Sequence, residues 1–335
     1  MKKSKTWLSI LLGAVIIVTT ACGNSSTVQI EEGKVNVVTS FYPLYYMAKE
    51  IGGEHVNVMN LIPSGVEPHD WTPKSVDLQN VSQAQIMLYQ GAGFEGWIGD
   101  FKNGLDNNSK VKLIEASKGI SLIEGTNAEE ESGHGHEHDN GQGHNEASEH
   151  HQENEEGHSH EGGIDPHTWV SPKSAIVMAE NVKQALIDAD SSNKVYYEER
   201  HKQLHDKLVA LDKQYSESIK QTTKKDIIVS HHAFGYLARD YDIHQHAIMG
   251  IAPNAEPRAQ DILRLTKLVE EKQIKYIFFE ELVSDTLAKT LASEANVETL
   301  VLNPLEGLTK EQEAAGDNYL TLMERNLQHL LKALQ

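Results

Sequence analysis

Residues 35–65 read VNVVTSFYPLYYMAKEIGGEHVNVMNLIPSG, two short apolar runs on either side of a helical segment. We expect strands over residues 35–40 and 56–62, because each is rich in valine, isoleucine or leucine and is followed by a segment with a proline. The segment 44–51 between them predicts a helix. A strand, a helix and a strand in succession indicate a parallel sheet with helices on its faces.

The same alternation continues along the chain and resumes after an interruption. Further strands are expected over residues 86–89, 111–114, 226–230, 274–279 and 297–302. Ser171-Pro172 predicts a helix start, with a hydroxyl cap and a proline at the first helical position. A second helix is expected over 193–219, where 1.5 Å per residue gives a length of ~40 Å. A third, over 317–334, closes the chain.

These elements predict an α/β fold of two lobes, each with a parallel sheet flanked by helices. The N-terminal lobe covers residues 34–190 and the C-terminal lobe residues 223–335. One long rigid helix, within residues 191–222, joins them. Ligands of such sheets bind beyond the carboxyl ends of the strands, so we expect the site in the cleft between the lobes.

The N-terminus has the features of an export signal. Three lysines within residues 1–5 precede an uncharged, mostly apolar run at 7–18, which is too short to span a membrane. The following Ala21-Cys22 resembles a bacterial lipobox, although Thr19 stands where leucine is commoner. We expect a signal peptide at 1–21, lipidation of Cys22, a flexible tether at 22–33, and anchoring to the outer face of the bacterial cytoplasmic membrane. The alternative is a plain secretory peptide; either way, the sole cysteine leaves no disulfide.

The net charge and the distribution of charged residues indicate which classes of ligand the protein can bind. The net charge is -19, which argues against a nucleic-acid partner, because phosphate binding needs a basic face. Residues 126–163 hold eight histidines and eleven acidic residues with almost nothing to bury, so disorder is expected there. These histidines form a possible auxiliary metal-collecting segment, the alternative being a solvated linker: His134, His136, His138, His144, His150, His151, His158 and His160.

Four side chains lie at or near strand ends, two from each lobe. They are His69, His167, His231 and Glu306. Three imidazoles and one carboxylate complete a four-coordinate shell for a borderline cation such as Zn²⁺. The remaining histidines, at 55, 201, 205, 244, 246 and 329, are interpreted as structural or surface residues.

The motifs around these residues resemble a known family. They are Gly-x-Glu-Pro-His at 65–69, Asp-Pro-His-x-Trp-x-Ser-Pro at 165–172, Ser-His-x-Ala-Phe-x-Tyr at 230–236 and Asn-Pro-Leu-Glu at 303–306. They are similar to the zinc group of the metal-binding receptors (cluster A-I) of ABC transporters. The resemblance implies two lobes bridged by a rigid helix, with His69, His167, His231 and Glu306 as ligands. It implies a monomeric extracytoplasmic receptor that captures Zn²⁺ for the permease and ATPase of an ABC importer.

Several alternatives stay open. Glu280 and Glu281 end the strand at 274–279 and rival Glu306, which the family motif favours; His232 is interpreted as a supporting or solvent-facing residue. A manganese or iron receptor of the same family would use more carboxylates, while Cu²⁺ and Ni²⁺ also bind imidazole. A surface adhesin or metal buffer is the next alternative. A zinc hydrolase is disfavoured, and we expect no enzyme, because no His-Glu-x-x-His or nucleophile motif occurs.

Overall fold

The computed structural model describes residues 30–106, 108–124, 163–253 and 259–335. The predicted signal peptide, Cys22, most of the predicted tether and all eight histidines of the segment 126–163 lie outside the described residues. Among the described helices, none combines the length and the apolar character that a membrane crossing requires.

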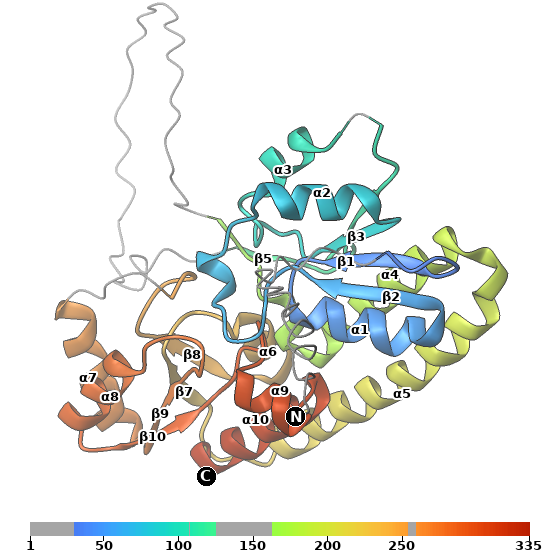
Figure 1. The fold of residues 1–335 in the computed structure, drawn as a ribbon. Coiled ribbons are helices and arrows are strands. Elements are labelled where there is room, and N and C mark those ends of the chain that lie inside the picture. The colour runs from blue at the N-terminus through green and yellow to red at the C-terminus, as the bar shows by residue number, and fades with distance from the viewer. Residues whose placement is uncertain (1–29, 107, 125–162, 254–258) are drawn as a thin grey trace, which may run out of the picture.

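The N-terminal lobe is built on a four-stranded parallel sheet in the order β2-β1-β3-β4 (Figure 1). Val37 packs on one face with α1 and α4, whereas Val38 packs on the other face with α2 and α3, since successive residues of a strand point to opposite faces. Both faces are covered, which explains the uninterrupted apolar run IMLY of the central strand β3. The elements are β1 (Val35–Thr39), α1 (Tyr42–Gly52), η1 (Gly53–His55), β2 (Val56–Asn60), η2 (Pro68–Asp70), α2 (Ser75–Gln83), β3 (Ile86–Tyr89), α3 (Ile98–Gly104) and β4 (Lys112–Glu115).

The C-terminal lobe repeats this plan with a parallel sheet in the order β10-β9-β7-β8. Its elements are β7 (Asp226–Val229), α6 (Gly235–Tyr241), β8 (His244–Ala247), α7 (Ala259–Lys272), β9 (Tyr276–Phe279), α8 (Thr286–Glu294), β10 (Glu298–Val301), α9 (Lys310–Ala315) and α10 (Tyr319–Ala333). Strand β8, with the sequence HQHA, was not predicted. It lies at the edge of the sheet, where only one neighbour pairs with it, so its sequence lacks the apolar run of a central strand.

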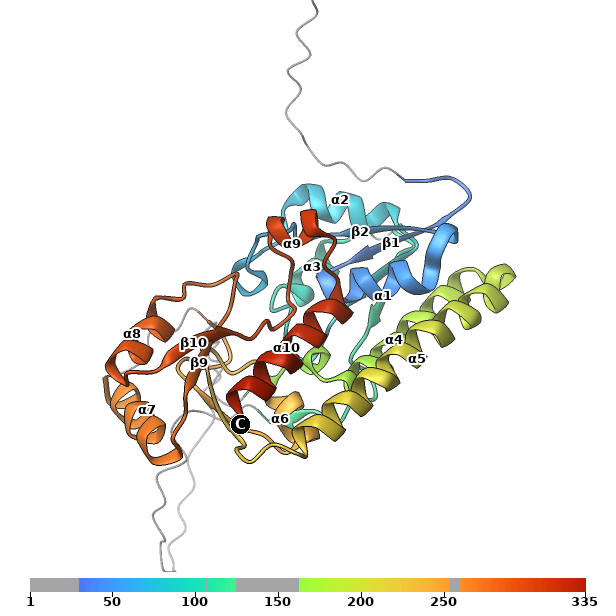
Figure 2. The ribbon, with the colours of Figure 1, turned by 90° about the horizontal axis from the view of Figure 1, so that it is seen from below.

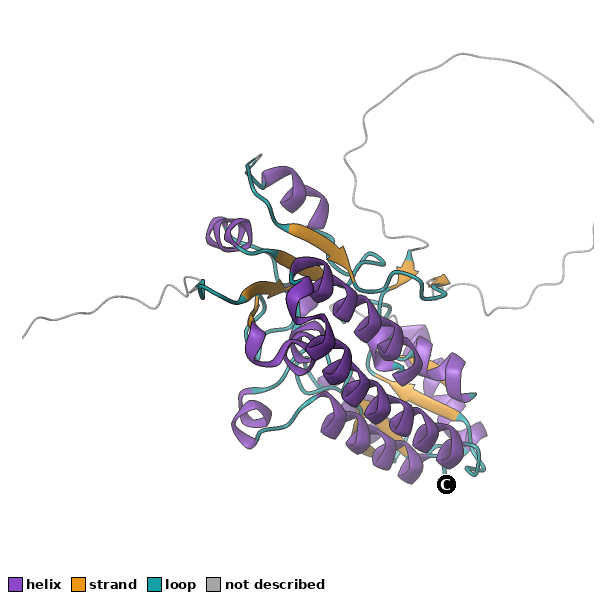
Figure 3. Ribbon diagram, turned by 90° about the vertical axis from the view of Figure 1, so that its right-hand side faces the viewer, coloured by secondary structure: helices purple, strands orange, loops and turns teal. Residues whose placement is uncertain are grey.

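A helical hairpin connects the lobes. It consists of α4 (Pro172–Ala189), η4 (Ser191–Asn193) and α5 (Lys194–Ile219), and the predicted long helix is present within one residue of its expected bounds. Helix α5 contacts α1 of the first lobe and α6 and α10 of the second. Figures 2 and 3 show these helices side by side along the molecule.

The two lobes share one hydrophobic core. A single cluster of buried side chains runs from Met47 of α1 through Tyr197 and Leu208 of α5 to Tyr236 and Leu330 of the C-terminal lobe. Smaller clusters fill the outer face of each sheet. The connecting helix is therefore part of the core.

The start of α4 differs from its prediction in one detail. Ser171 is at the N-cap position and Pro172 at the first helical position, as expected, but the Ser171 hydroxyl makes no capping bond. It donates to Oδ2 of Asp240 on α6. The Ser171 hydroxyl thus links η3 (Thr168–Val170) and α4 to the second lobe. This tertiary contact takes the place of the expected capping bond.

A short antiparallel ladder lies at the two ends of residues 125–162. Strands β5 (Ile123–Glu124) and β6 (Ile164–Asp165) pair, with Ile123 opposite Asp165. The Tyr236 hydroxyl donates to the Asp165 carbonyl and accepts from the Ile123 amide. Strands β5 and β6, which flank residues 125–162 in the sequence, are therefore tied to each other and to α6.

Candidate metal centre

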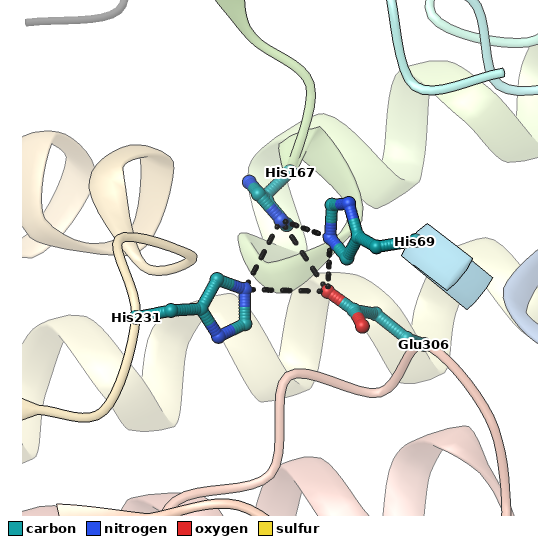
Figure 4. A group of neighbouring side chains, drawn as sticks. All are labelled: His69, His167, His231 and Glu306. Atoms are coloured by element: carbon teal, nitrogen blue, oxygen red, sulfur yellow. Dashed lines mark hydrogen bonds and ion pairs between the residues drawn. The ribbon is translucent and has the colours of Figure 1, made fainter. Parts of the chain in front are cut away.

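Four side chains from the two lobes point at one another in Figure 4: His69, His167, His231 and Glu306, here called the interlobe centre. Each offers one ligand atom, and these atoms all lie within 4.8 Å of one another. His69 belongs to η2, after β2, and His167 directly precedes η3. His231 follows β7, and Glu306 lies in the loop after β10. The parallel topology of each sheet brings its strand ends to the edge where the centre lies.

The separations fit one tetrahedral shell. Nε2 of His69 lies 3.2 Å from Nε2 of His167 and 3.3 Å from Oε1 of Glu306. Nε2 of His167 lies 3.3 Å from the same oxygen, and Nε2 of His231 lies 3.4 Å from Nε2 of His167 and 3.6 Å from Oε1 of Glu306. Bonds of ~2.0–2.2 Å to a tetrahedral zinc would place neighbouring ligand atoms ~3.3–3.6 Å apart. Five of the six pairs of ligand atoms thus have separations that match a cation of this size.

The interlobe centre is almost closed to solvent. His167 and His231 are fully buried and Glu306 is 1% exposed, while the His69 side chain is 11% exposed. Phe94 packs edge-on against His69, and Trp169 lies against His167. A cation here would lie in a low-dielectric surrounding, where its attraction to the carboxylate is strong.

His69 is held through its backbone. Glu67 precedes η2, and its Oε1 accepts a hydrogen bond from the His69 amide at 3.1 Å. Gly65 has a left-handed φ of +83° and donates its amide to the Leu308 carbonyl of the Glu306 loop at 2.7 Å. A loop of the first lobe and a loop of the second are thereby joined directly at the site.

Asp165 orients His167. Its Oδ1 accepts from the His167 amide at 3.0 Å and lies 2.8 Å from Nδ1 of the same imidazole. A proton on Nδ1 leaves Nε2 unprotonated, with its lone pair toward the interlobe centre. The Trp169 indole then donates to the Pro304 carbonyl at 2.7 Å, which ties the His167 segment to the Glu306 loop.

Glu280, the possible alternative ligand, lies behind His231. Its Oε1 is 2.6 Å from Nδ1 of His231 and accepts from the Ser230 hydroxyl. The carboxylate therefore faces the nitrogen opposite to the one that points at the centre. This is the arrangement of a supporting carboxylate that fixes the imidazole tautomer.

Glu281 supports the turn that presents Glu306. Its Oε2 accepts from the Asn303 side-chain amide and from Gln312. Asn303 Oδ1 in turn accepts from the amide of Leu305, which has a left-handed φ of 61°. Such a conformation costs free energy in a non-glycine residue and persists where surrounding contacts determine it. Glu281 belongs to this network and is not among the four gathered ligand groups.

The neighbouring carboxylates set the charge of the imidazoles. Burial alone would lower the pKa of His167 and His231, but the opposing effect of nearby carboxylates is larger. Asp165 and Glu306 raise the pKa of His167, and Glu280 and Glu306 raise that of His231 well above its ordinary value. Burial would raise the pKa of Glu306, yet His69, His167 and His231 hold it well below its ordinary range. The centre therefore attracts positive charge, which protons or a divalent cation can supply.

Glu67 is a further acidic group beside the centre. Burial, and then the negative charge of Glu306, raise the pKa of Glu67 to about 9. Burial and the charge of Glu306 thus favour the neutral form of the Glu67 carboxyl, whereas Glu306 is the one acidic residue among the four ligand groups.

The comparisons with known proteins agree with this geometry. The family model described as "ZnuA: Zinc-uptake complex component A periplasmic" matches residues 37–333. The chain belongs to this family. It is 39% identical over 334 residues to the high-affinity zinc uptake system protein ZnuA of Bacillus subtilis, covering 98% of each chain. It is also 39% identical over 330 residues to the zinc-binding lipoprotein AdcA of Streptococcus pneumoniae, covering 98% of this chain and 60% of AdcA.

Among solved structures, this ZnuA-family chain resembles the Zn(II)-bound ZnuA-like domain of Streptococcus pneumoniae AdcA. The TM-score is 0.72 at 35% identity, and the match covers 90% of this chain and 99% of that domain. The two-lobed α/β fold expected from the sequence is confirmed. The chain spans about 60% of the length of the full AdcA relative, and that part corresponds to its ZnuA-like domain.

Sequence reasoning gave no supporting role to the carboxylates of Asp165 and Glu280 in this ZnuA-family chain. Asp165 had a local signal, since it stands two residues before His167 in Asp-Pro-His. Glu280 had a weaker one: it follows β9, and β9 is paired with β7, the strand that leads into His231. His232 donates its amide to the Gly250 carbonyl and is not among the four gathered ligands.

The six histidines interpreted as structural or surface residues lie outside the interlobe centre. His55 packs on Tyr196, His246 contacts Asp226, and His329 contacts the Val301 carbonyl. His244 is exposed near Asp226. His201 and His205 lie on α5.

Proposed function

We propose that this protein is an extracytoplasmic receptor that captures Zn²⁺ at the interlobe centre and delivers it to an ABC importer. His69, His167, His231 and Glu306 are the proposed ligands. The observation that carries the proposal is that three imidazole nitrogens and one carboxylate oxygen lie within 4.8 Å of one another, with five of their six separations at 3.2–3.6 Å. The ZnuA family match and the printed names of the relatives support zinc as the cargo.

The ligand types favour zinc within this family. Imidazole suits zinc, copper and nickel, whereas manganese prefers more oxygen ligands. Four protein ligands also complete a tetrahedral shell, while a hydrolytic zinc site keeps one position for water. The closed shell supports a role in holding and releasing the ion, and not in catalysis.

The remaining parts of the proposal concern location and partners. Lipidation of Cys22 would hold the receptor, as a monomer, at the outer face of the cytoplasmic membrane, where it would meet a permease driven by an ATPase. The eight histidines of residues 134–160 would collect zinc weakly near the centre, because both ends of residues 125–162 meet at β5 and β6, beside His167.

The test is metal analysis of protein purified without added metal, followed by competition titration of Zn²⁺, Mn²⁺, Cu²⁺ and Ni²⁺ against chelators. We expect one tight zinc equivalent whose affinity falls sharply in His69→Ala and His231→Ala. Tighter manganese than zinc binding would overturn the zinc assignment. Uptake in cells that lack the chain tests transport separately: an adhesin or a metal buffer would leave zinc uptake unchanged.

A further inference from the structure

The helical hairpin carries a second group of metal-ligating side chains. His201 and His205 are four residues apart on α5, so they lie on the same face of the helix. Glu180 of α4 lies opposite, because α4 and α5 pack against each other in the hairpin. Nε2 of His201 is 3.4 Å from Oε2 of Glu180, and the two imidazole rings are 5.8 Å apart between centroids.

His201 has a buried nitrogen that lacks a hydrogen-bond partner. The residue is 8% exposed, and its Nε2 is buried without a partner of hydrogen-bonding geometry. Buried polar atoms are normally paired, since an unpaired one costs free energy. Burial also lowers the pKa of His201, so its imidazole is neutral at pH 7, which is the form that binds metals.

The spacing of the two rings resembles that of the interlobe centre. There, the three pairs of imidazole rings are 5.2, 5.3 and 5.7 Å apart, compared with 5.8 Å for His201 and His205. Two histidines at i and i+4 on one helix face form a known arrangement for binding zinc. The His205 side chain is 41% exposed, so its ring is less confined than that of His201, whose side chain is 11% exposed.

The charged neighbours determine what such a site can bind. Lys183 contacts Oε1 of Glu180 at 2.5 Å, which leaves Oε2, the oxygen nearest His201. Asp206 lies 3.7 Å from Nδ1 of His205 and is paired with Lys202. The group therefore offers two imidazoles and one carboxylate oxygen to a cation. The positive charge of the nearby Lys183 ammonium disfavours cation binding.

We propose that His201, His205 and Glu180 form a second binding site for a borderline divalent cation, with zinc as the first candidate. The site is weaker than the interlobe centre, because it has three protein ligands, because His205 must rotate, and because Lys183 competes for the carboxylate. Water completes the shell. A bound ion would link α4 to α5, the two helices of the hairpin that connects the lobes.

The experiment is histidine footprinting of the full chain with diethyl pyrocarbonate, resolved by peptide mass spectrometry, at free Zn²⁺ set by a metal buffer. The interlobe centre is loaded first, and free zinc is then raised further. We expect modification of His205 to slow by about tenfold when free zinc is about ten times the dissociation constant. In His201→Ala and Glu180→Gln the slowing at the same free zinc should be less than twofold.

Lys202→Ala is the matched control, because it changes an exposed residue on the same helix that is not a proposed ligand. It should keep the protection of His205. Glu180 is half-exposed, so Glu180→Gln tests the site even if the buried His201→Ala variant does not fold. Retention of one tight zinc equivalent identifies folded variants. Absence of slowing in the unmodified chain, or full slowing in folded Glu180→Gln protein, would overturn the proposal.

Discussion

Nδ1 of His231 lies 2.6 Å from Oε1 of Glu280, while Nε2 of the same ring faces His167 and Glu306. The two residues come from neighbouring strands, β7 and β9, which pair in one parallel sheet. The carboxylate thus acts from behind the imidazole: it selects the tautomer that presents an unprotonated Nε2, and it increases the basicity of that nitrogen.

Glu280→Gln should weaken zinc binding without removing a ligand. The amide is neutral, so it makes His231 a poorer ligand, and loss of such a supporting group typically costs about 10–100-fold in metal affinity. Competition titration against a chelator measures the change. Glu294→Gln, an exposed acid on α8, is the matched control and should keep the original affinity. An unchanged affinity in Glu280→Gln would contradict the supporting role.

Glu306→Gln should reduce zinc affinity by more than ~100-fold, beyond the range for a supporting residue. The change removes the one carboxylate among the four proposed ligands and leaves three buried imidazoles around a dication. X-ray absorption of the zinc-loaded variant should show three imidazoles and a weaker oxygen ligand. If the variant kept full affinity while Glu281→Gln lost it, Glu281 would be the ligand and our assignment would be wrong.

Trp169→Phe tests the link between the His167 segment and the Glu306 loop. The variant keeps an aromatic ring in the core but loses the indole bond to the Pro304 carbonyl, 2.7 Å long and fully buried. A buried acceptor without its donor costs about 1–3 kcal/mol of unfolding free energy. Denaturant unfolding of metal-free protein measures the loss, with Trp97→Phe as a control at a less buried tryptophan. A loss below about 0.5 kcal/mol would show that water replaces the indole.

Much of the fold could be predicted because its central strands are buried on both faces. Residues 86–89 form β3 as expected, and 226–230 match β7 to within one residue, since continuous apolar runs mark such strands. Strand β8 carries no such run: none of its residues is fully buried, and its His246 contacts Asp226. Local pattern also could not reveal that α5 lies inside a core common to both lobes, as this depends on contacts between residues distant in sequence.

The candidate site was predictable in part for a related reason. His69, His231 and Glu306 follow strand ends, and parallel topology gathers those ends. Glu280 reaches His231 because β7 pairs with β9. Local sequence patterns do not reveal which strands pair, so they indicate Glu280 as a possible ligand and not as the partner of His231. The pairing of His201 with Glu180 similarly depends on the register of the α4–α5 hairpin.

Deletion of residues 128–161 should leave the described fold intact. The antiparallel pair β5–β6 would then be closed by the five remaining residues 125–127, 162 and 163, within the usual length of a hairpin loop. Thermal unfolding of the metal-free variant should match that of the full chain, and tightly bound zinc should be about one equivalent. A large loss of thermal stability would show that the deleted segment packs against the lobes.

The pH dependence of zinc binding tests the three-histidine shell most directly. Asp165, Glu280 and Glu306 raise the pKa of His167 and His231, so these imidazoles bind protons at pH values above the ordinary ~6.5 of histidine. Zinc must displace those protons, because only neutral imidazole coordinates it. Apparent affinity should therefore be highest at alkaline pH and begin to fall before pH 6.5 is reached. Glu306, whose pKa is well below its ordinary range, stays ionised throughout.

The slope of the logarithm of apparent zinc affinity against pH gives the number of imidazoles that lose a proton when zinc binds. Each ligand that must lose a proton contributes up to about tenfold per pH unit, so three give up to about a thousandfold per unit once all are protonated. The measurement is a competition titration from pH 8 to pH 5 against a chelator of known proton linkage, using protein without residues 128–161, whose histidines titrate in the same window. A His69→Ala variant should show a slope lower by about one proton. A slope near zero between pH 6.5 and pH 5 would exclude the three-histidine shell, whichever metal is found at the centre.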